Sequence, residues 1–512
     1  MDPAIARRAV VAALAGGVIA ELLFDNVALG INVPIATVAT LALVTLLGRR
    51  RPADALDWWL PAVGAAASLG PALRTDPSVV ALDLWLTAIA IAAWSFAMSG
   101  VAVTRRAARA VALMGVQAGI ATVVGFAWLL TRIGADGALA RGTRQLGRAA
   151  PVLRGAVIAL PILVGFAILL ASADAVFGHA LDEALRLPDL GALVGRGAFA
   201  VVAAVLVAGP ITIAAGANGL LDPIAAATAS NGGAVDAGAV ADPDLAVESG
   251  KPRSGATEVI VVLVAVDLLF AAFAAIQVVY LFGGTDTLAT IGMTYSDYAR
   301  QGYFQLVGVV ALAGLLLIGA HEIAGRRRDL LAAGLTLLVL TGVILASAAL
   351  RLRLYQDAYG WTELRFFVAA SIGWLAAAVG IAISLLATDR MRWLPHGLAM
   401  SAVAITLAVS AIGPQSFVIN ENVARVLHPE LVPAGGHSGF DAAYGLTLGD
   451  DTIPALAAAV DRLPPVERME AVATLQTRKR QLDLDEALQS PLAWNLSRER
   501  AREALAGLPQ EP

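Results

Sequence analysis

Long apolar segments recur along the whole chain, and they constrain its fold more than any other feature. A helix needs about 20 apolar residues to cross the hydrocarbon core of a membrane. Because lipid offers the backbone no hydrogen-bond partner, helices are the natural spanning structure for such segments. The chain therefore predicts an all-α, polytopic transmembrane helix bundle of about 11 spans. The runs are 9–24, 33–47, 58–73, 79–100, 155–172, 195–215, 257–282, 303–321, 330–349, 364–387 and 396–418.

Composition supports this interpretation and narrows the possible partners. Of the 512 residues, 58% are hydrophobic and 15% are charged, whereas soluble proteins are about 25% charged. The net charge of -4 gives no indication of a nucleic-acid partner. The chain has no cysteine and its five histidines do not cluster, so no metal site and no cofactor are expected. Membrane lipids are the expected partners, while protein partners and oligomeric state stay open.

Basic residues indicate how the bundle is oriented. Cytoplasmic loops are enriched in lysine and arginine near the ends of spans. If a further apolar run, 110–131, does not cross the membrane, most such residues fall on one side; if it does cross, the two sides hold similar numbers. We therefore expect eleven crossings with a cytoplasmic N-terminus, twelve being the alternative. Lysine occurs only at Lys251 and Lys479, a bias typical of a GC-rich bacterium, which places the chain in a bacterial inner membrane.

Two segments divide the chain into predicted domains. Residues 216–256 are rich in Gly, Ala, Asp and Pro and predict a disordered linker between the spans of 1–215 and those of 257–418. From residue 419 the chain becomes polar. Apolar residues at positions 453, 456, 460 and 463 follow the three- and four-residue spacing of an amphipathic helix. Residues 419–512, called the tail below, are expected to form a small helical domain on the exterior.

Tyrosine, arginine and aspartate gather in the connections predicted to lie at the outer face. Aromatic residues at a membrane interface and arginines that extend to it would explain many of them, together with local ion pairs. The orientation rule, however, disfavours arginine on this side, so a shared functional cluster stays open. Thr362 can cap the helix that follows Gly360, with Glu363 in its first turn. The candidate residues are Asp174, Tyr280, Tyr298, Arg300, Arg351, Tyr355, Asp357, Tyr359 and Arg365.

Two polar residues lie within an apolar run. Asp267 and Gln277 fall inside 257–282. Ionisable residues within membrane segments usually face the bundle interior and often mark a pathway. The alternative is a hydrogen bond between helices, which contributes about 0.6 kcal/mol on average. Both interpretations of these two residues stay open.

Several motifs resemble a known family. They are LLASADAVF (169–177), FAAFAAIQVVYLFGG (270–284), GMTYSDYARQGYFQL (292–306), SAALRLRLYQDAYGWTELR (347–365) and LTLGDDTIPAL (446–456). In this order they resemble the bacterial membrane family catalogued as domain of unknown function 4173. The resemblance implies a multi-pass membrane protein and brings no activity, substrate or catalytic residue.

Three classes of function fit these observations. The first is a transporter, channel or accessory membrane component with a polar outer vestibule. The second is a membrane-embedded enzyme that acts on a lipid or envelope precursor, with Asp174 or Asp357 as acid or base and an arginine that binds phosphate. The third is a membrane sensor or scaffold. The sequence does not decide whether the chain is an enzyme.

Overall fold

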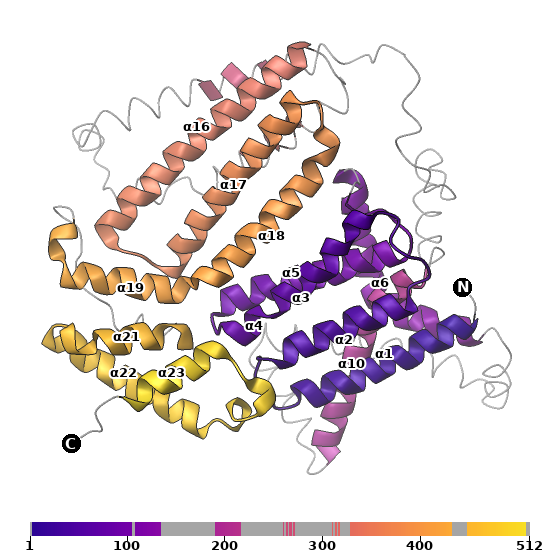
Figure 1. Cartoon of the computed structure of the whole chain (residues 1–512), viewed down its shortest axis with the longest axis horizontal. Helices are drawn as coiled ribbons and strands as arrows, with labels where there is room; N and C mark the ends of the chain where they lie inside the picture. The colour runs from indigo at the N-terminus through magenta and orange to yellow at the C-terminus, as the bar shows by residue number, and fades with distance from the viewer. Residues whose placement is uncertain are drawn as a thin grey trace, which may run out of the picture. The chain divides into compact units, whose positions relative to one another are not determined.

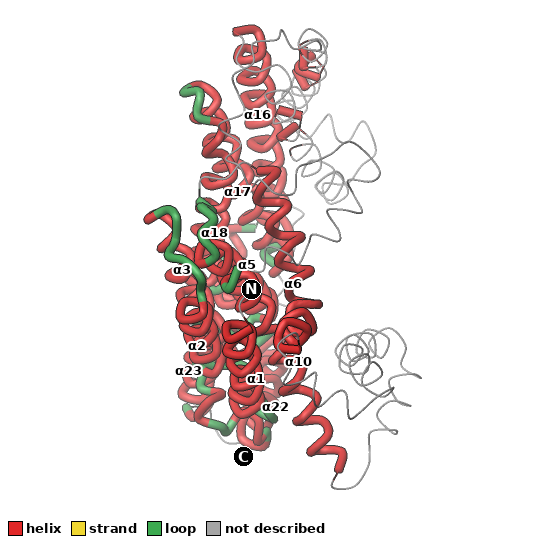
Figure 2. Tube along the Cα trace, turned by 90° about the vertical axis from the view of Figure 1, so that its right-hand side faces the viewer, coloured by secondary structure: helices red, strands yellow, loops and turns green. Residues whose placement is uncertain are grey.

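The computed structural model describes residues 3–104, 108–134, 190–216, 328–432 and 448–507, with single positions between 260 and 271 and between 310 and 317. Every regular element in these parts is a helix, which confirms the all-α prediction for them (Figure 1, Figure 2). The chain divides into two compact units. Unit 1 comprises Met1–Leu73, Asp83–Pro243 and Asp485–Asn495, and unit 2 comprises Arg74–Leu82, Asp244–Leu484 and Leu496–Pro512.

Unit 1 is built around the packing of its first helix against two later ones. Helix α1 packs along α10 and also contacts α6. The contact is close because small residues line it: a β-carbon added at Gly17 of α1 would overlap the carbonyl oxygen of Ala200 in α10. The helices of unit 1 are α1 (Pro3–Phe24), α2 (Asn32–Leu47), α3 (Trp59–Ser68), α4 (Gly70–Leu73), most of α5 (Pro77–Met98), α6 (Ala108–Gly134) and α10 (Leu190–Ala214), with short 3-10 turns at Ala55–Trp58, Glu486–Leu488 and Pro491–Ala493.

Unit 2 contains three long helices that follow one another in the chain, and a group of short ones. Helices α16 and α17 pack together, as do α17 and α18, and Leu338, Leu375 and Val379 are among the buried residues between them. The helices are α16 (Arg328–Tyr359), α17 (Glu363–Ala387), α18 (Leu394–Ile412), α19 (Pro414–Leu427), α21 (Ile453–Ala459), α22 (Pro465–Leu484) and α23 (Leu496–Ala506), with 3-10 turns η3 (Met391–Trp393), η4 (Pro429–Leu431), η5 (Asp450–Thr452) and η6 (Val460–Arg462).

Four helices among the described residues are long and apolar enough to cross a membrane. They are Pro77–Met98, Arg328–Tyr359, Glu363–Ala387 and Met391–Ile412. Each corresponds to an apolar run found in the sequence. These helices indicate a membrane protein.

Two predicted spans are interrupted in the structure. The run 58–73 is divided at Leu69 into α3 and α4, and the run 396–418 is divided at Gly413, whose φ is +71°. A proline follows each break, Pro71 and Pro414. Proline lacks an amide hydrogen and its ring clashes with the carbonyl four residues earlier, so it ends a helix. The predicted bounds of these two runs were wrong because a hydropathy scan detects apolar side chains and does not detect a break in a helix.

The described part of the tail contains the predicted amphipathic helix. Ile453, Leu456, Val460 and Leu463 are all buried, as their spacing predicts. Another stretch of the tail, 485–495, belongs to unit 1. There the amide of Ile31 donates to the carbonyl of Trp494 at 3.0 Å, and the side-chain amide of Asn495 donates to the carbonyl of Pro71 at 2.8 Å.

Candidate functional site

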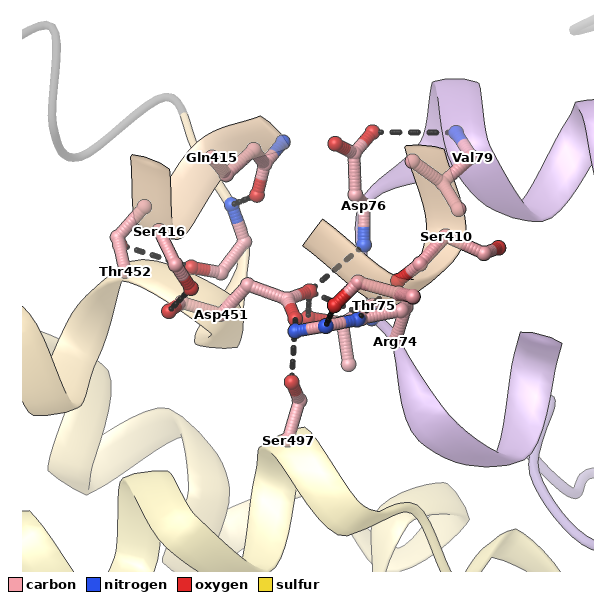
Figure 3. A network of polar contacts seen from close by, with 12 residues as sticks. Arg74, Thr75, Asp76, Val79, Ser410, Gln415, Ser416, Asp451, Thr452 and Ser497 are labelled. Atoms are coloured by element: carbon pink, nitrogen blue, oxygen red, sulfur yellow. Dashed lines mark hydrogen bonds and ion pairs between the residues drawn. The ribbon is translucent and has the colours of Figure 1, made fainter. Parts of the chain in front are cut away.

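The ends of four candidate membrane helices meet in unit 2 around a group of polar residues. We call this group the helix-end cluster and define it by Arg74, Thr75, Asp76, Glu363, Gln415 and Asp451. Most of it is drawn in Figure 3. It contains the start of α5, the start of α17 and the end of α18. The end of α16 lies close to it, because α17 follows α16 after a short turn.

Asp451 joins the tail to the residues just before α5. Its Oδ2 accepts hydrogen bonds from the amides of Thr75 and Asp76, at 2.7 and 3.0 Å, and from the hydroxyl of Thr75 at 2.9 Å. Its Oδ1 accepts from the hydroxyl of Ser497 in α23 and lies 3.4 Å from Nη1 of Arg74 (Figure 3). The side chain of Asp451 is 1% exposed. A carboxylate is favoured here because amides at the start of a helix carry partial positive charge.

Asp76 caps helix α5. Its Oδ1 accepts from the amides of Ser78 and Val79 at 2.9 and 3.3 Å, and Pro77 takes the first helical position. The residue is 1% exposed, and its Oδ2 accepts no hydrogen bond from any residue that the structure describes. Burial, then the charge of Glu363 and to a lesser degree that of Asp451, raise the pKa of Asp76 from 3.8 to about 7, against the effect of the two amides.

Glu363 and Gln415 connect three helices and the tail. Oε1 of Glu363 accepts from the hydroxyl of Ser78 in α5 at 2.6 Å, and its Oε2 accepts from the side-chain amide of Gln415 in α19 at 3.3 Å. The carbonyl oxygen of the Gln415 side chain accepts from the amide of Gly449 at 2.7 Å. The hydroxyl of Thr362 accepts from the amide of Arg365 at 3.3 Å, which confirms Thr362 as the predicted cap of α17.

Arginines occupy the opposite helix ends. The last four carbonyls of a helix lack partners within it and carry partial negative charge. Arg74 donates to the carbonyls of Ser410 and Ala411 at the end of α18, at 2.8 and 2.5 Å. Arg425 donates from α19 to the carbonyls of residues 356, 357 and 358 at the end of α16, at 3.3, 2.7 and 3.2 Å. Burial lowers the pKa of Arg425, an effect that Asp357 opposes.

A third arginine completes this arrangement. Nη1 of Arg365 donates to the carbonyls of Tyr359 and Gly360, at 3.0 and 2.5 Å. Its guanidinium carbon lies 4.1 Å from the centroid of the Tyr355 ring, within the range of a cation–π contact. The rings of Tyr355 and Tyr359 lie 5.1 Å apart, measured between centroids. These contacts give Arg74, Arg365 and Arg425 a structural role at helix ends.

The structure brings together some of the residues predicted from the sequence. Tyr355, Tyr359 and Arg365 are in contact. Arg351 lies one turn earlier, with Nη2 at 3.5 Å from the hydroxyl of Ser347, and Asp357 is exposed. Asp267 is buried. The remaining candidates lie outside the described residues, so the meeting of all of them stays a prediction. These are Asp174, Tyr280, Gln277, Tyr298 and Arg300.

Sequence reasoning missed the acids that the structure places at the centre. Asp76 and Pro77 form a readable signal, a cap followed by the proline of a first helical turn. Asp451 lies in the motif LTLGDDTIPAL, but no local pattern shows what it contacts. Asp83 lies inside the run 79–100 and was missed although Asp267 was singled out on the same ground. It is fully buried, and a β-carbon added at Gly70 would overlap its carboxylate.

No metal centre is present among the described side chains, since no group of three or more histidines or acids there could hold a metal ion. The arrangement can instead neutralise helix ends, hold the tail and bind protons.

The described part of the chain defines an all-α protein with several long apolar helices, in which Asp76, Arg74 and Arg425 bind backbone groups at helix ends. Residues 9–459 match the family described as Domain of unknown function (DUF4153), and the chain belongs to that family. The resemblance to family 4173 was wrong in its number, although a family of unknown function was expected. The matched range includes all four candidate spans and Asp451. Neither a curated protein nor a solved structure matches the chain.

Proposed function

We propose that the chain is a multi-pass protein of the bacterial inner membrane that acts as an accessory membrane component, with its tail fixed on the outer ends of its helices. In this proposal the N-terminus is cytoplasmic, the tail is exterior and about 11 spans cross the bilayer. Four long apolar helices and the family match support a membrane role.

The hydrogen bond from the hydroxyl of Ser78 to Glu363 supports the proposed number of membrane crossings. It requires the starts of α5 and α17 to lie on one face of the membrane, so an even number of crossings must separate them. The predicted spans from 79–100 to 330–349 supply an even number when 110–131 does not cross, and an odd number when it does. The contact thus supports eleven crossings over twelve.

The contacts of Asp451 support the proposal that the tail is fixed on the helix ends. They join η5 and α23 to the segment before α5, while the hydroxyl of Ser416 in α19 donates to the carbonyl of Asp451 at 2.5 Å. A tail held in this way fixes the helix ends relative to one another. The structure gives less support to an enzyme whose arginine binds phosphate, because the guanidinium of Arg365 already donates to two carbonyls and lies over the ring of Tyr355.

Cysteine cross-linking tests the docking, since the chain has no cysteine of its own. A β-carbon at Gly449 would lie 2.9 Å from Oγ1 of Thr75. Disulfides need β-carbons about 4 Å apart, so the pair Thr75→Cys and Gly449→Cys should cross-link. A protease site inserted at residue 235 would reveal the cross-link as two fragments that stay joined until reduction. The control pair, Thr75→Cys with the exposed Thr477→Cys, should not cross-link. Failure of the first pair would contradict the docked tail.

Labelling tests the exterior placement. A single Thr477→Cys in intact cells should react with a membrane-impermeant maleimide. Reaction only after the membrane is permeabilised would place the tail inside and contradict the proposal.

Transport is a second candidate, favoured by one observation. Asp83 is fully buried within α5, a candidate membrane helix, and such acids often lie on ion pathways. In proteoliposomes under an imposed membrane potential, proton flux should be present, lost in Asp83→Asn and kept in Asp329→Asn, which changes an exposed acid. The absence of flux in the unaltered protein would exclude proton transport.

A further inference from the structure

One carboxylate oxygen in the helix-end cluster has no partner among the described residues. Oδ2 of Asp76 accepts no hydrogen bond, while Oδ1 accepts two from amides, and the residue is 1% exposed. In Figure 3 the unbonded oxygen lies on the side of Gln415. A buried ionised oxygen without a donor is costly, and a proton on that oxygen removes the cost.

Two other carboxyls face Asp76 from neighbouring elements. Glu363 faces it from α17 and Asp451 faces it from η5. Gln415 on α19 is polar but neutral. Arg74 is the cation closest in sequence, and its guanidinium is bound to Asp451 and to two carbonyls of α18. The carboxyl of Asp76 thus lies beside two other carboxyls, and carboxylates close together do not readily ionise at the same time.

We propose that Asp76 and Glu363 form a proton-binding carboxyl pair at the ends of helices α5 and α17, with the proton on Oδ2 of Asp76. The proton comes from solvent and returns to it, so no other reactant is required. Asp76 holds the proton because both oxygens of Glu363 accept hydrogen bonds, from Ser78 and Gln415, which stabilise its charge. Glu363 is also less buried than Asp76.

Loss of the proton adds a negative charge beside Asp451. The amide of Asp76 donates to that same carboxylate, so repulsion acts directly on the contact that holds the tail. The pair thereby links proton binding to tail docking. This link holds whether the chain is an accessory component or a transporter, since it depends only on the cluster.

Infrared difference spectroscopy of the full chain in detergent tests the site. The carbonyl stretch of a protonated carboxyl should disappear with a midpoint near pH 7 in the unaltered protein. It should be missing from the difference spectrum of Asp76→Asn and unchanged in Asp483→Asn, which alters an exposed acid of α22. Asparagine is a good helix cap, so Asp76→Asn should fold. The same band in Asp76→Asn would overturn the assignment, as would the absence of any such band.

A second variant tests the pairing. Glu363→Gln removes the neighbouring charge, so the midpoint of the Asp76 band should move to lower pH. Glu421→Gln, at an exposed position of α19, should leave it in place. An unmoved midpoint in Glu363→Gln would show that the two carboxyls do not act as a pair. This outcome is separate from failure of the docking experiment, which concerns Asp451.

Discussion

Replacing Asp451 by alanine should release η5 from the segment before α5 without unfolding α22, while residues 485–495 keep their contacts within unit 1. The carboxylate accepts hydrogen bonds from Thr75, Asp76 and Ser497 and forms an ion pair with Arg74. The variant leaves these donors without their acceptor. Removing one partner of a buried ion pair costs about 3–5 kcal/mol. Thr75 and Arg74 are partly exposed, so water can replace some of the lost bonds and the lower end of that range applies.

This loss of free energy can be measured as a faster reaction of a cysteine that the docked tail buries. About 3 kcal/mol raises the population of the undocked tail roughly 100-fold, since 1.4 kcal/mol corresponds to a factor of about ten. A reporter is the variant Thr452→Cys, because Thr452 is fully buried beside Asp451. In the Asp451→Ala background its reaction with a maleimide should accelerate by about 100-fold.

Two comparisons make the assay specific. The reporter Thr474→Cys is buried within α22 and reacts only when that helix unfolds. Its rate of reaction with the maleimide should therefore change little in the Asp451→Ala background. Asp461→Ala should have almost no effect, since its ion pair with Arg468 is exposed and such pairs contribute about 0–1 kcal/mol. An acceleration below about tenfold at Thr452 would refute the idea that Asp451 holds the tail.

Three further outcomes are expected. Arg425→Gln removes donors to the last carbonyls of α16 and should lower the stability of unit 2 by about 1–3 kcal/mol, measured by thermal unfolding in detergent; an unchanged melting temperature would contradict the capping role. Because the folded state raises the pKa of Asp76 from 3.8 to about 7, its stabilising contribution is complete below 3.8 and lost by about pH 7. Between these two pH values the free energy of unfolding should fall by at most about 4 kcal/mol in the unaltered protein. In Asp76→Asn the free energy of unfolding should fall by less over the same pH range. Reporter fusions at residues 140, 235 and 512 should indicate cytoplasm, cytoplasm and exterior; a cytoplasmic signal at 512 would contradict the proposed side of the tail.

Local patterns predicted the elements well where one physical effect dominates. Helices α16 and α17 follow from apolar length alone, and the burial of Leu456 and its neighbours follows from helical spacing. The cap at Thr362 follows from side-chain chemistry within one turn. In each case the interacting residues lie close together in sequence. Backbone breaks were harder, because Gly413 and Leu69 sit inside runs that are apolar throughout.

The candidate site could be predicted only in part. Tyr355, Tyr359 and Arg365 lie within eleven consecutive residues: one turn of α16 brings the two tyrosines together, and the short connection at Gly360 returns Arg365 of α17 to them. Asp76, Glu363 and Asp451 are far apart in the chain, and only the packing of several helices makes them neighbours. No periodicity encodes such a contact. Asp83 is different: its position inside an apolar run was visible, and the criterion applied to Asp267 would have found it.

The arginine caps also constrain the order in which the protein can be assembled. The carbonyls at the end of α16 are bound by Arg425, which lies 67 to 69 residues further along the chain. A ribosome therefore releases that end of the helix well before its partner has been made. The end of α18 differs, because its partner Arg74 precedes it by more than 300 residues and is available from the start. Closure of this end of unit 2 consequently waits for α19, and a nascent chain stopped before residue 425 would expose the α16 carbonyls to water or to other molecules.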